Sequence, residues 1–434
     1  MQYLSTRDSA LRVSAQEAIV RGLAPQSGLF VPETFPQADL DAWKNLSYPE
    51  LAEKVLAGFL TDYSADFLHT ATASTYGAAF GGKAGETVKV RDGLYSLELW
   101  HGPTCAFKDY ALQLMPKLLV EAKKMLGRTE TTRILVATSG DTGKAALAGY
   151  ADLDGIEIEV FYPNDGTSEI QHLQMATQKG ENVQVYAVQG NFDDAQTGVK
   201  KVFADADVAA ELEKRGIRLS SANSINWGRL VPQIVYYFYA YFRLAEQGAV
   251  EWGKPVDFCV PTGNFGDILA GYYAKQMGLP VGRLVCASNQ NNVLTDFLST
   301  GTYDRNRPFY QTASPSMDIL ISSNLERLLA LMEGAGENVA DYMNALAAHG
   351  KYTVKPETAQ KIASEFACGF CGDEDTKKTI AQLFAEQGYL LDTHTAVAWN
   401  VAGQYRTKSG SDRPLVVVST ASPFKFCKSV LEAL

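Results

Sequence analysis

The feature that most constrains the fold of this chain is an order that occurs twice: an apolar strand, a glycine-rich turn and a helix. Residues 134–137 (Ile-Leu-Val-Ala) run into the turn 139–143 (Ser-Gly-Asp-Thr-Gly), and a helix of small residues follows. Residues 256–260 run likewise into the turn 263–267 (Gly-Asn-Phe-Gly-Asp) and a second helix. Strands that alternate with helices pair in parallel, and helices cover both faces of such a sheet. The sequence therefore predicts an open α/β fold.

Further apolar segments extend this alternation along the chain. Short strands are predicted at residues 156–161, 183–188, 283–287 and 415–418. The first 95 residues lack the alternation and are mostly helical in pattern, so we expect an N-terminal subdomain over residues 1–95. We expect a large α/β domain built from residues 96–135 and 251–434, and a small α/β domain over residues 136–250.

Composition limits the classes of partner. The chain has 434 residues, of which 46% are hydrophobic and 20% charged, with a formal net charge of −10. The negative charge argues against a nucleic acid or an anionic membrane as partner, but a locally basic pocket could still take a phosphorylated substrate. The first eight residues have no secretory pattern, and the longest apolar run, 230–242, is too short to cross a bilayer. We expect a cytoplasmic protein with no membrane partner.

Lys108 is the first candidate for chemistry. It stands in the stretch 101–109 (His-Gly-Pro-Thr-Cys-Ala-Phe-Lys-Asp), just before the apolar helical run 110–115. A lysine amine condenses with carbonyl cofactors, of which pyridoxal phosphate is the commonest. An isolated Phe-Lys-Asp is usually an ordinary lysine at the start of a helix. Its occurrence together with two glycine turns favours the functional interpretation.

The two glycine turns are candidate anion sites. Free backbone N–H groups at the start of a helix, together with the helix dipole, attract phosphate or carboxylate. In open α/β sheets such turns lie at the carboxyl ends of the strands, where ligands bind. Neither turn is a dinucleotide fingerprint or a Walker loop, and either one alone is equally consistent with a structural turn.

A second anion site is predicted in the run 223–229 (Asn-Ser-Ile-Asn-Trp-Gly-Arg). It offers amide groups, a hydroxyl and the guanidinium of Arg229, whose fork matches a phosphate or a carboxylate. The alternative is a loop that only caps the next helix. Thr420, just after the strand 415–418, could donate a hydrogen bond to a cofactor ring nitrogen, although a hydroxyl at a strand end is usually a cap.

The remaining polar motifs give weaker indications of function. The cysteines are scattered and predict no disulfide framework, and the pair Cys368 and Cys371 is better explained as incidental spacing than as a redox dithiol. No neighbouring Cys or His completes a zinc set, so no metal site is predicted. His101 and His394 are candidates by position only, with a structural histidine as the default.

With these residues identified, the chain resembles the threonine synthase family, in its bacterial and fungal subgroup. The resemblance covers nearly the whole length, and its lysine and glycine motifs are shared with the wider group of fold type II pyridoxal-phosphate enzymes. The motifs that carry it are 3–7 (Tyr-Leu-Ser-Thr-Arg), 21–25 with 28–32, the lysine stretch, 138–143, 263–267, 314–319 (Ser-Pro-Ser-Met-Asp-Ile) with 323–327 (Ser-Asn-Leu-Glu-Arg), and 392–397 (Asp-Thr-His-Thr-Ala-Val).

The resemblance implies a reaction and a cofactor. The family converts O-phospho-L-homoserine and water to L-threonine and phosphate with pyridoxal phosphate, in a fold of two open α/β domains. We expect a monomer or a homodimer. The chain carries Ser422 where members of the subgroup often have histidine, which leaves the role of this last loop open.

The resemblance also implies roles, position by position. Lys108 would hold the cofactor and move protons at Cα and Cβ of the substrate. The implied cofactor-binding residues are Lys108, Asp141, Gly263, Asn264, Phe265, Gly266, Asp267 and Thr420. The implied substrate-binding residues are Ser139, Gly140, Thr142, Lys144, Asn223, Ser224, Asn226 and Arg229, with Lys144 and Lys425 as weaker candidates for the substrate phosphate.

Two alternatives remain at this stage. A serine or threonine dehydratase would have the same lysine and glycine loop but no use for the 223–229 phosphate site. A pyridoxal-phosphate-binding protein without turnover is the rival from another class. Release of phosphate from phosphohomoserine, against release of a keto acid from serine or threonine, separates the three.

Overall fold

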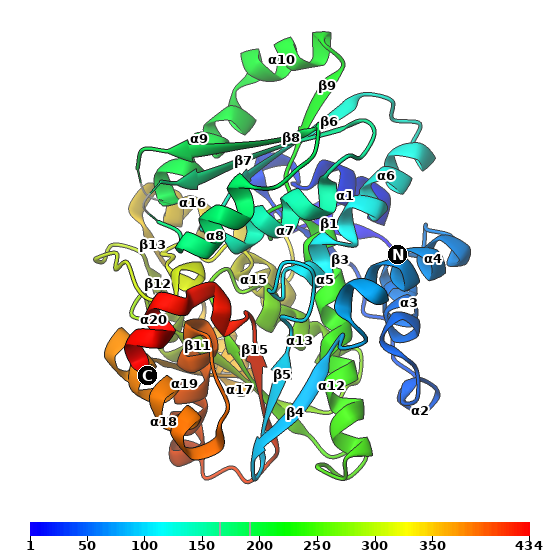
Figure 1. Ribbon diagram of the computed structural model, residues 1–434. Helices are drawn as coiled ribbons and strands as arrows, with labels where there is room; N and C mark the ends of the chain where they lie inside the picture. The colour runs from blue at the N-terminus through cyan, green and yellow to red at the C-terminus, as the bar shows by residue number, and fades with distance from the viewer. Residues whose placement is uncertain (165, 191) are drawn as a thin grey trace.

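A computed structural model describes residues 1–164, 166–190 and 192–434, and it contains two large sheets in separate halves of the molecule (Figure 1). The six-stranded sheet has the order β14-β11-β10-β15-β5-β4, and the four-stranded sheet has the order β8-β7-β6-β9. Pairing is parallel throughout except where β4 pairs with β5. The predicted α/β class is therefore confirmed.

The six-stranded sheet is buried on both faces. Its strands are β4 (Glu86–Arg91), β5 (Leu94–Glu98), β10 (Val256–Pro261), β11 (Val281–Ser288), β14 (Phe366–Phe370) and β15 (Leu415–Ser419). Along β15, Val416 and Val418 pack into one hydrophobic core, while Leu415 and Val417 pack into a second. Alternate side chains point to opposite faces of a strand, so this sheet is covered on each side.

Helices surround this sheet in the same half. They are α13 (Gly266–Gln276), α14 (Val293–Thr300), α15 (Leu325–Glu333), α16 (Glu337–His349), α17 (Pro356–Glu365), α18 (Asp373–Gln387), α19 (Thr393–Ser409) and α20 (Cys427–Ala433), with the 3₁₀ turns η4 (Pro315–Met317) and η5 (Pro423–Phe426). A two-stranded sheet pairs β12 (Thr302–Asp304) with β13 (Lys351–Thr353). No helix in the described ranges is long and apolar enough to cross a membrane.

The four-stranded sheet has its own helices. Its strands are β6 (Thr131–Ala137), β7 (Ile156–Pro163), β8 (Val183–Val188) and β9 (Ile217–Ser220). The helices of this half are α7 (Asp141–Tyr150), α8 (Glu169–Ala176), α9 (Phe192–Ala204) and α10 (Ala206–Lys214). The remaining helices are α5 (Asp109–Leu112), α6 (Met115–Met125), α11 (Trp227–Leu230), η3 (Val231–Gln233) and α12 (Ile234–Glu246), the last of which packs against α13 and α3. The strands predicted around 134–137, 156–161, 183–188, 256–260, 283–287 and 415–418 are all confirmed.

The N-terminal part forms a small antiparallel sheet of order β2-β1-β3 with helices beside it. Its elements are β1 (Tyr3–Ser5), β2 (Asp8–Val13), α1 (Ala15–Arg21), η1 (Pro25–Ser27), β3 (Phe30–Pro32), α2 (Leu40–Trp43), α3 (Tyr48–Phe59), α4 (Ala65–Tyr76) and η2 (Ala78–Phe80). Strand β4, which falls within the range 1–95, pairs with β5 at the edge of the six-stranded sheet, and β6, within 96–135, belongs to the four-stranded sheet. The division at residues 95, 135 and 250 stays a prediction.

Candidate functional site

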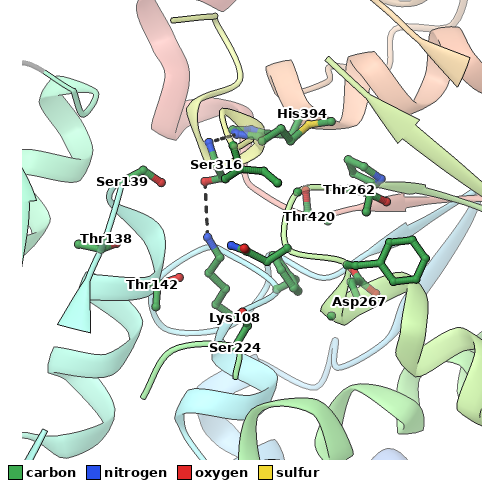
Figure 2. Close-up of a pocket in the computed structure, with 18 of the residues that line it drawn as sticks. Lys108, Thr138, Ser139, Thr142, Ser224, Thr262, Asp267, Ser316, His394 and Thr420 are labelled. Carbon is green, nitrogen blue, oxygen red and sulfur yellow. Dashed lines mark hydrogen bonds between the residues drawn. The ribbon is translucent and has the colours of Figure 1, made fainter. Parts of the chain in front are cut away.

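A cavity lies at the carboxyl ends of strands from both sheets (Figure 2). Ala137 and Thr138 at the end of β6, Pro261 and Thr262 at the end of β10, and Thr420 after β15 all line it. This edge is where parallel α/β sheets place their ligands. The sequence-predicted site residues on its wall are Lys108, Ser139, Thr142, Asn223, Ser224, Arg229, Gly263, Asn264, Phe265, Gly266, Asp267 and Thr420.

Lys108 is held by a backbone connection to the C-terminal strand. The amide of Phe107 donates to the carbonyl of Thr420 at 2.8 Å, and the amide of Ser422 donates to the carbonyl of Cys105 at 3.1 Å. Asp109, directly after the lysine, is fully buried and accepts hydrogen bonds from the amide and hydroxyl of Thr104 at 2.8 and 2.7 Å. The lysine backbone is therefore fixed on both sides.

The electrostatic surroundings of Lys108 favour its neutral form. Burial lowers the pKa of this amine to about 8, although the carboxylate of Asp141 works in the opposite direction. The positive charges of Arg229 and Lys425 lower it further. An amine with a pKa near neutrality can take up and release protons under physiological conditions.

Asp141 is committed to other side chains and lies away from the cavity wall. Its Oδ1 is 2.7 Å from Nζ of Lys425 and accepts a hydrogen bond from Nε2 of Gln171 at 2.9 Å. Burial alone would raise the pKa of this carboxyl, but Lys425 and Lys108 together hold it well below its usual range. Asp141 acts on Lys108 through its charge, and its contact with the cofactor stays a prediction.

The turn at residues 263–267 forms a cradle in front of α13. A Cβ added at Gly263 would lie 2.8 Å from the carbonyl oxygen of Ser316, so the glycine permits a close approach of two backbones. Phe265 has φ +61°, in the left-handed region, and directs the chain into the helix. The first N–H groups of a helix have no intrahelical partner, and here they lie at the cavity.

Asp267 lies within this cradle and differs from a typical phosphate-binding residue. Its Oδ1 accepts hydrogen bonds from the hydroxyls of Tyr236 and Tyr237 at 2.6 and 2.7 Å, while Oδ2 is buried with no partner among the described residues. Burial raises the pKa of this carboxyl to about 6, against the effect of the two tyrosine hydrogen bonds. With Asp318, it is one of two carboxyls on a cavity wall that also carries Lys108 and Arg229.

The run 223–229 presents unsatisfied polar atoms. Arg229 is only 3% exposed; its Nη1 donates to the carbonyl of Ala222 at 2.6 Å, and its Nε has no partner in the described part of the chain. Asn223 donates from Nδ2 to the carbonyl of Ala137 at 3.2 Å, while its buried Oδ1 is likewise unpaired. Because Asn223 and Arg229 also line the cavity, these atoms could bind a polar ligand there, with Nε as a donor and Oδ1 as an acceptor.

Three other predicted residues do not reach the cavity. Asn226 uses its amide for structure: Oδ1 accepts from the amide of Gly228 at 2.9 Å and Nδ2 donates to the carbonyl of Ile19 at 3.0 Å, as a helix cap does. Lys144 donates to the side chain of Gln178. Gly140 has φ +136°, and a Cβ there would lie 2.5 Å from Cδ of Gln171, so this glycine serves the turn itself. None of the three lines the cavity, and their substrate contacts stay predictions.

Lys425, which the resemblance implied only as a weaker candidate for the substrate phosphate, contacts several segments around the site. It is 2% exposed, and its Nζ contacts Asp141 and donates to the carbonyl of Thr104 at 2.8 Å. It lines a wider neighbouring cavity that shares Ser139 and Asp318 with the first one. Lys425 therefore connects the C-terminal segment, the lysine loop and the turn after β6.

Sequence reasoning missed other residues on the cavity wall. Ser316, Asp318 and His394 line it. The motif 314–319, which contains Ser316, supports the family resemblance but predicts no role for that residue. His394 was placed in the structural class by default, although the Asp392 that precedes it by two residues caps α19. Cys368 lies in β14 and Cys371 directly after it, and both are free thiols.

Comparisons with known proteins agree with this geometry. A model described as "Threonine synthase N terminus" matches residues 2–76, and one described as "Pyridoxal-phosphate dependent enzyme" matches residues 84–365. Threonine synthase from Pseudomonas aeruginosa is 40% identical over 438 residues, which cover all of this chain and 90% of that protein. The chain belongs to the threonine synthase family.

Solved structures and other relatives extend this membership. The crystal structure of pyridoxal-phosphate-bound threonine synthase from Brucella melitensis superposes with a TM-score of 0.91 at 39% identity, covering 100% of this chain and 91% of that one. Human "Threonine synthase-like 1" is 40% identical over 455 residues, and the chain spans only 60% of its length. The family uses pyridoxal phosphate, so the predicted cofactor and the fold type II architecture are confirmed.

Proposed function

We propose that this member of the threonine synthase family is a lyase that converts O-phospho-L-homoserine and water to L-threonine and phosphate. The observation that carries the proposal is the meeting of Lys108 with two separate anion-binding elements at one cavity. One is the backbone cradle 263–267, and the other is the guanidinium of Arg229, whose buried Nε–H has no partner in the described part of the chain. The reaction requires two phosphate groups to be held, one on the cofactor and one on the substrate.

The residues present fit the cofactor. The close approach of Gly263 to Ser316 leaves the N–H groups at the start of α13 turned to the cavity, where they would hold the cofactor phosphate. Thr420 would donate its hydroxyl to the ring nitrogen, and Lys108 would hold the carbonyl group. When bound, pyridoxal phosphate supplies an electron sink for negative charge that develops on the substrate carbons.

The chain supplies the proton transfers and the anion clamp. The amine of Lys108, with its pKa of about 8, takes protons from Cα and Cβ of the substrate in its neutral form and returns them as an ammonium group. Arg229 holds the substrate phosphate against water while that group leaves. Ser139 and Thr142 reach the cavity from the turn after β6, where their hydroxyls can bind the substrate carboxylate.

A product assay on the purified holoenzyme tests the proposal. We expect inorganic phosphate and threonine from O-phospho-L-homoserine, and no keto acid from serine or threonine. Ketobutyrate or pyruvate without phosphate release would instead establish a dehydratase. A cofactor absorbance band with no turnover of any of these substrates would establish a binding protein.

Arg229→Lys and Arg229→Met separate the substrate clamp from the cofactor cradle. Lysine keeps the charge but lacks the planar fork, so we expect KM for phosphohomoserine to rise about tenfold with Lys and further with Met, with cofactor affinity retained. Loss of the cofactor from both variants would assign Arg229 to the cofactor phosphate instead.

We further propose a cytoplasmic monomer or homodimer with no nucleic-acid partner.

A further inference from the structure

The amine of Lys108 points to a hydroxyl that has no assigned role. Its Nζ lies 3.5 Å from Oγ of Ser316, and this is its single hydrogen bond within the described ranges (Figure 2). Ser316 belongs to η4, in a loop more than two hundred residues further along the chain, and lines the same cavity. The contact therefore depends on the tertiary fold.

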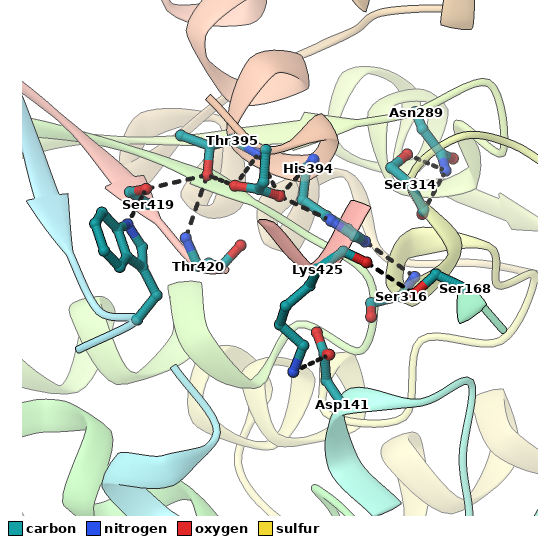
Figure 3. A network of polar contacts seen from close by, with 12 residues as sticks. Asp141, Ser168, Asn289, Ser314, Ser316, His394, Thr395, Ser419, Thr420 and Lys425 are labelled. Atoms are coloured by element: carbon teal, nitrogen blue, oxygen red, sulfur yellow. Dashed lines mark hydrogen bonds and ion pairs between the residues drawn. The ribbon is translucent and has the colours of Figure 1, made fainter. Parts of the chain in front are cut away.

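Ser316 is held by a buried histidine and aspartate. Its backbone N–H donates to Nε2 of His394 at 3.1 Å, and Nδ1 of His394 is 3.0 Å from Oδ1 of Asp392 (Figure 3). His394 is 3% exposed and Asp392 1% exposed. Because Nε2 accepts a hydrogen bond, the proton of the neutral ring lies on Nδ1, toward the carboxylate. The pair thus presents a fixed acceptor to the backbone of Ser316.

A hydroxyl suits an amine that must change its protonation state. It accepts a hydrogen bond from an ammonium group and donates one to a neutral amine, whereas a carboxylate only accepts. Asp141, the carboxylate whose charge acts on Lys108, is already paired with Lys425 at 2.7 Å. Among the described residues Lys108 therefore has no direct ion pair, which would hold it protonated.

We propose that Ser316 is a further catalytic residue, whose hydroxyl holds the amine of Lys108 in both its protonation states, and that His394 is its positioning residue. Ser316 neither gains nor loses a proton: its O–H rotates from accepting at Oγ to donating to Nζ when Lys108 gives up a proton. This inference rests on the proposed function, in which Lys108 moves protons on the substrate.

The test measures the amine directly. Pyridoxal phosphate is added to the full-length cofactor-free protein between about pH 6 and about pH 10, and the growth rate of its absorbance band is recorded, because only the neutral amine attacks the aldehyde. The hydrogen bond to Ser316 is stronger for the charged ammonium than for the neutral amine, so its loss in Ser316→Ala should lower the midpoint of this profile by about one pH unit. Asp141, Arg229 and Lys425, the charged groups that act on Lys108, are unchanged in this variant.

Two matched variants control for the loop. Ser316→Thr keeps the hydroxyl and should keep the wild-type midpoint. Ser314→Ala lies two residues away, where the hydroxyl accepts from Asn289 at 3.0 Å and does not contact Lys108, and it should also keep that midpoint. A wild-type midpoint in Ser316→Ala would overturn the catalytic role, and an equal fall in Ser314→Ala would show a loop effect and overturn it too.

The positioning role of His394 is tested by a conservative pair. His394→Gln retains a side-chain acceptor for the N–H of Ser316, while His394→Ala does not. We expect the alanine variant to lose about tenfold in kcat with KM little changed and to reproduce the midpoint of Ser316→Ala, with glutamine restoring both in part. A wild-type midpoint in His394→Ala would overturn the positioning role. Asp392 is avoided because it also binds Thr395, whose hydroxyl accepts from the amide of Thr420.

The inference and the proposed function fail separately. If the wild-type enzyme releases phosphate but Ser316→Ala keeps the wild-type midpoint, only the role of Ser316 is lost. If Ser316→Ala shifts the midpoint while the wild-type enzyme releases no phosphate, the lysine–serine contact stands and the proposed substrate is wrong.

Discussion

The two glycine turns have the same place in the sequence pattern and different surroundings in the fold. Each follows a parallel strand and opens a helix, α7 or α13, and each puts an aspartate in the first turn of that helix. Asp141 faces the cation of Lys425, and Asp267 faces two tyrosine hydroxyls. The pKa of Asp141 is held well below its usual range, and that of Asp267 is raised to about 6.

This difference explains why the turn 263–267 can bind a ligand with its backbone while the turn 139–143 is mostly filled by other side chains. All of the residues 263–267 line the cavity, so the second turn presents its backbone to a ligand. In the first turn only Ser139 and Thr142 reach the cavity, because Gln171 packs against Gly140 and binds Asp141. A strand, a glycine turn and a helix therefore predict an anion site only where no side chain already fills the turn.

The largest expected effect comes from removing the cation of the first turn. Lys425→Met leaves Asp141 buried without its partner, and we expect the free energy of unfolding to fall by about 3–5 kcal/mol. Urea denaturation at pH 7 measures it. The double variant Lys425→Met with Asp141→Asn removes the stranded charge and should recover much of the loss; equal stability of the single variant and the wild type would show that the pair is not a buried one.

The stability contribution of Asp267, in the second turn, should depend on pH in the sense opposite to that of Asp141 in the first turn. Its pKa is raised from 3.8 to about 6 in the folded protein, so its contribution to stability is present in full below about pH 4 and is lost as the pH rises through about 6. Relative to wild type, Asp267→Asn should therefore become more stable by up to about 3 kcal/mol between pH 4 and pH 7. Unfolding free energies at both pH values measure this.

The matched variant in the first turn sharpens the contrast. The folded-state pKa of Asp141 is lowered, so its contribution is present at neutral pH and lost on acidification. Asp141→Asn should therefore lose stability relative to wild type as the pH rises from acid to neutral. The same sign in both variants would contradict the comparison.

The smallest expected effect concerns the backbone of the cradle. In Gly263→Ala the new Cβ would lie 2.8 Å from the carbonyl oxygen of Ser316, so we expect the two segments to separate and the affinity for pyridoxal phosphate to fall about tenfold. Equilibrium titration of the cofactor absorbance measures it. Gly266→Ala is the control, because its nearest contact, Nδ2 of Asn324, is at 3.4 Å; equal losses in both would point to the turn conformation instead.

The sequence predicted those parts of the site that follow from local pattern. Apolar runs of β-branched residues gave the strands, and the glycines after them gave the turns at their carboxyl ends. Lys108 was found because it stands at the start of a helix in a motif shared by a family. Asn226 shows the limit of local pattern, because a short polar side chain before a helix serves equally as a ligand and as a cap; here it caps α11 and donates to the carbonyl of Ile19.

The remaining parts depend on contacts that no local pattern encodes. Ser316 meets Lys108 across 208 positions of sequence, and Lys425 meets Thr104 across 321. The N-terminal motif shows the same dependence: Arg7 binds the carboxylate of Glu326 through Nε and Nη2, each at 2.8 Å. These segments carry motifs that are visible in the sequence, but their partners are set by the tertiary fold alone.

The hydrogen bonds between residues 105–107 and 420–422 have a consequence for alignment. They join the backbone that carries Lys108 to the backbone that carries Thr420, so that the two segments form one rigid unit. A movement of the C-terminal strand carries both segments together and leaves their spacing intact. A shift of the four-stranded sheet would therefore leave the spacing between the Lys108 and Thr420 backbones unchanged.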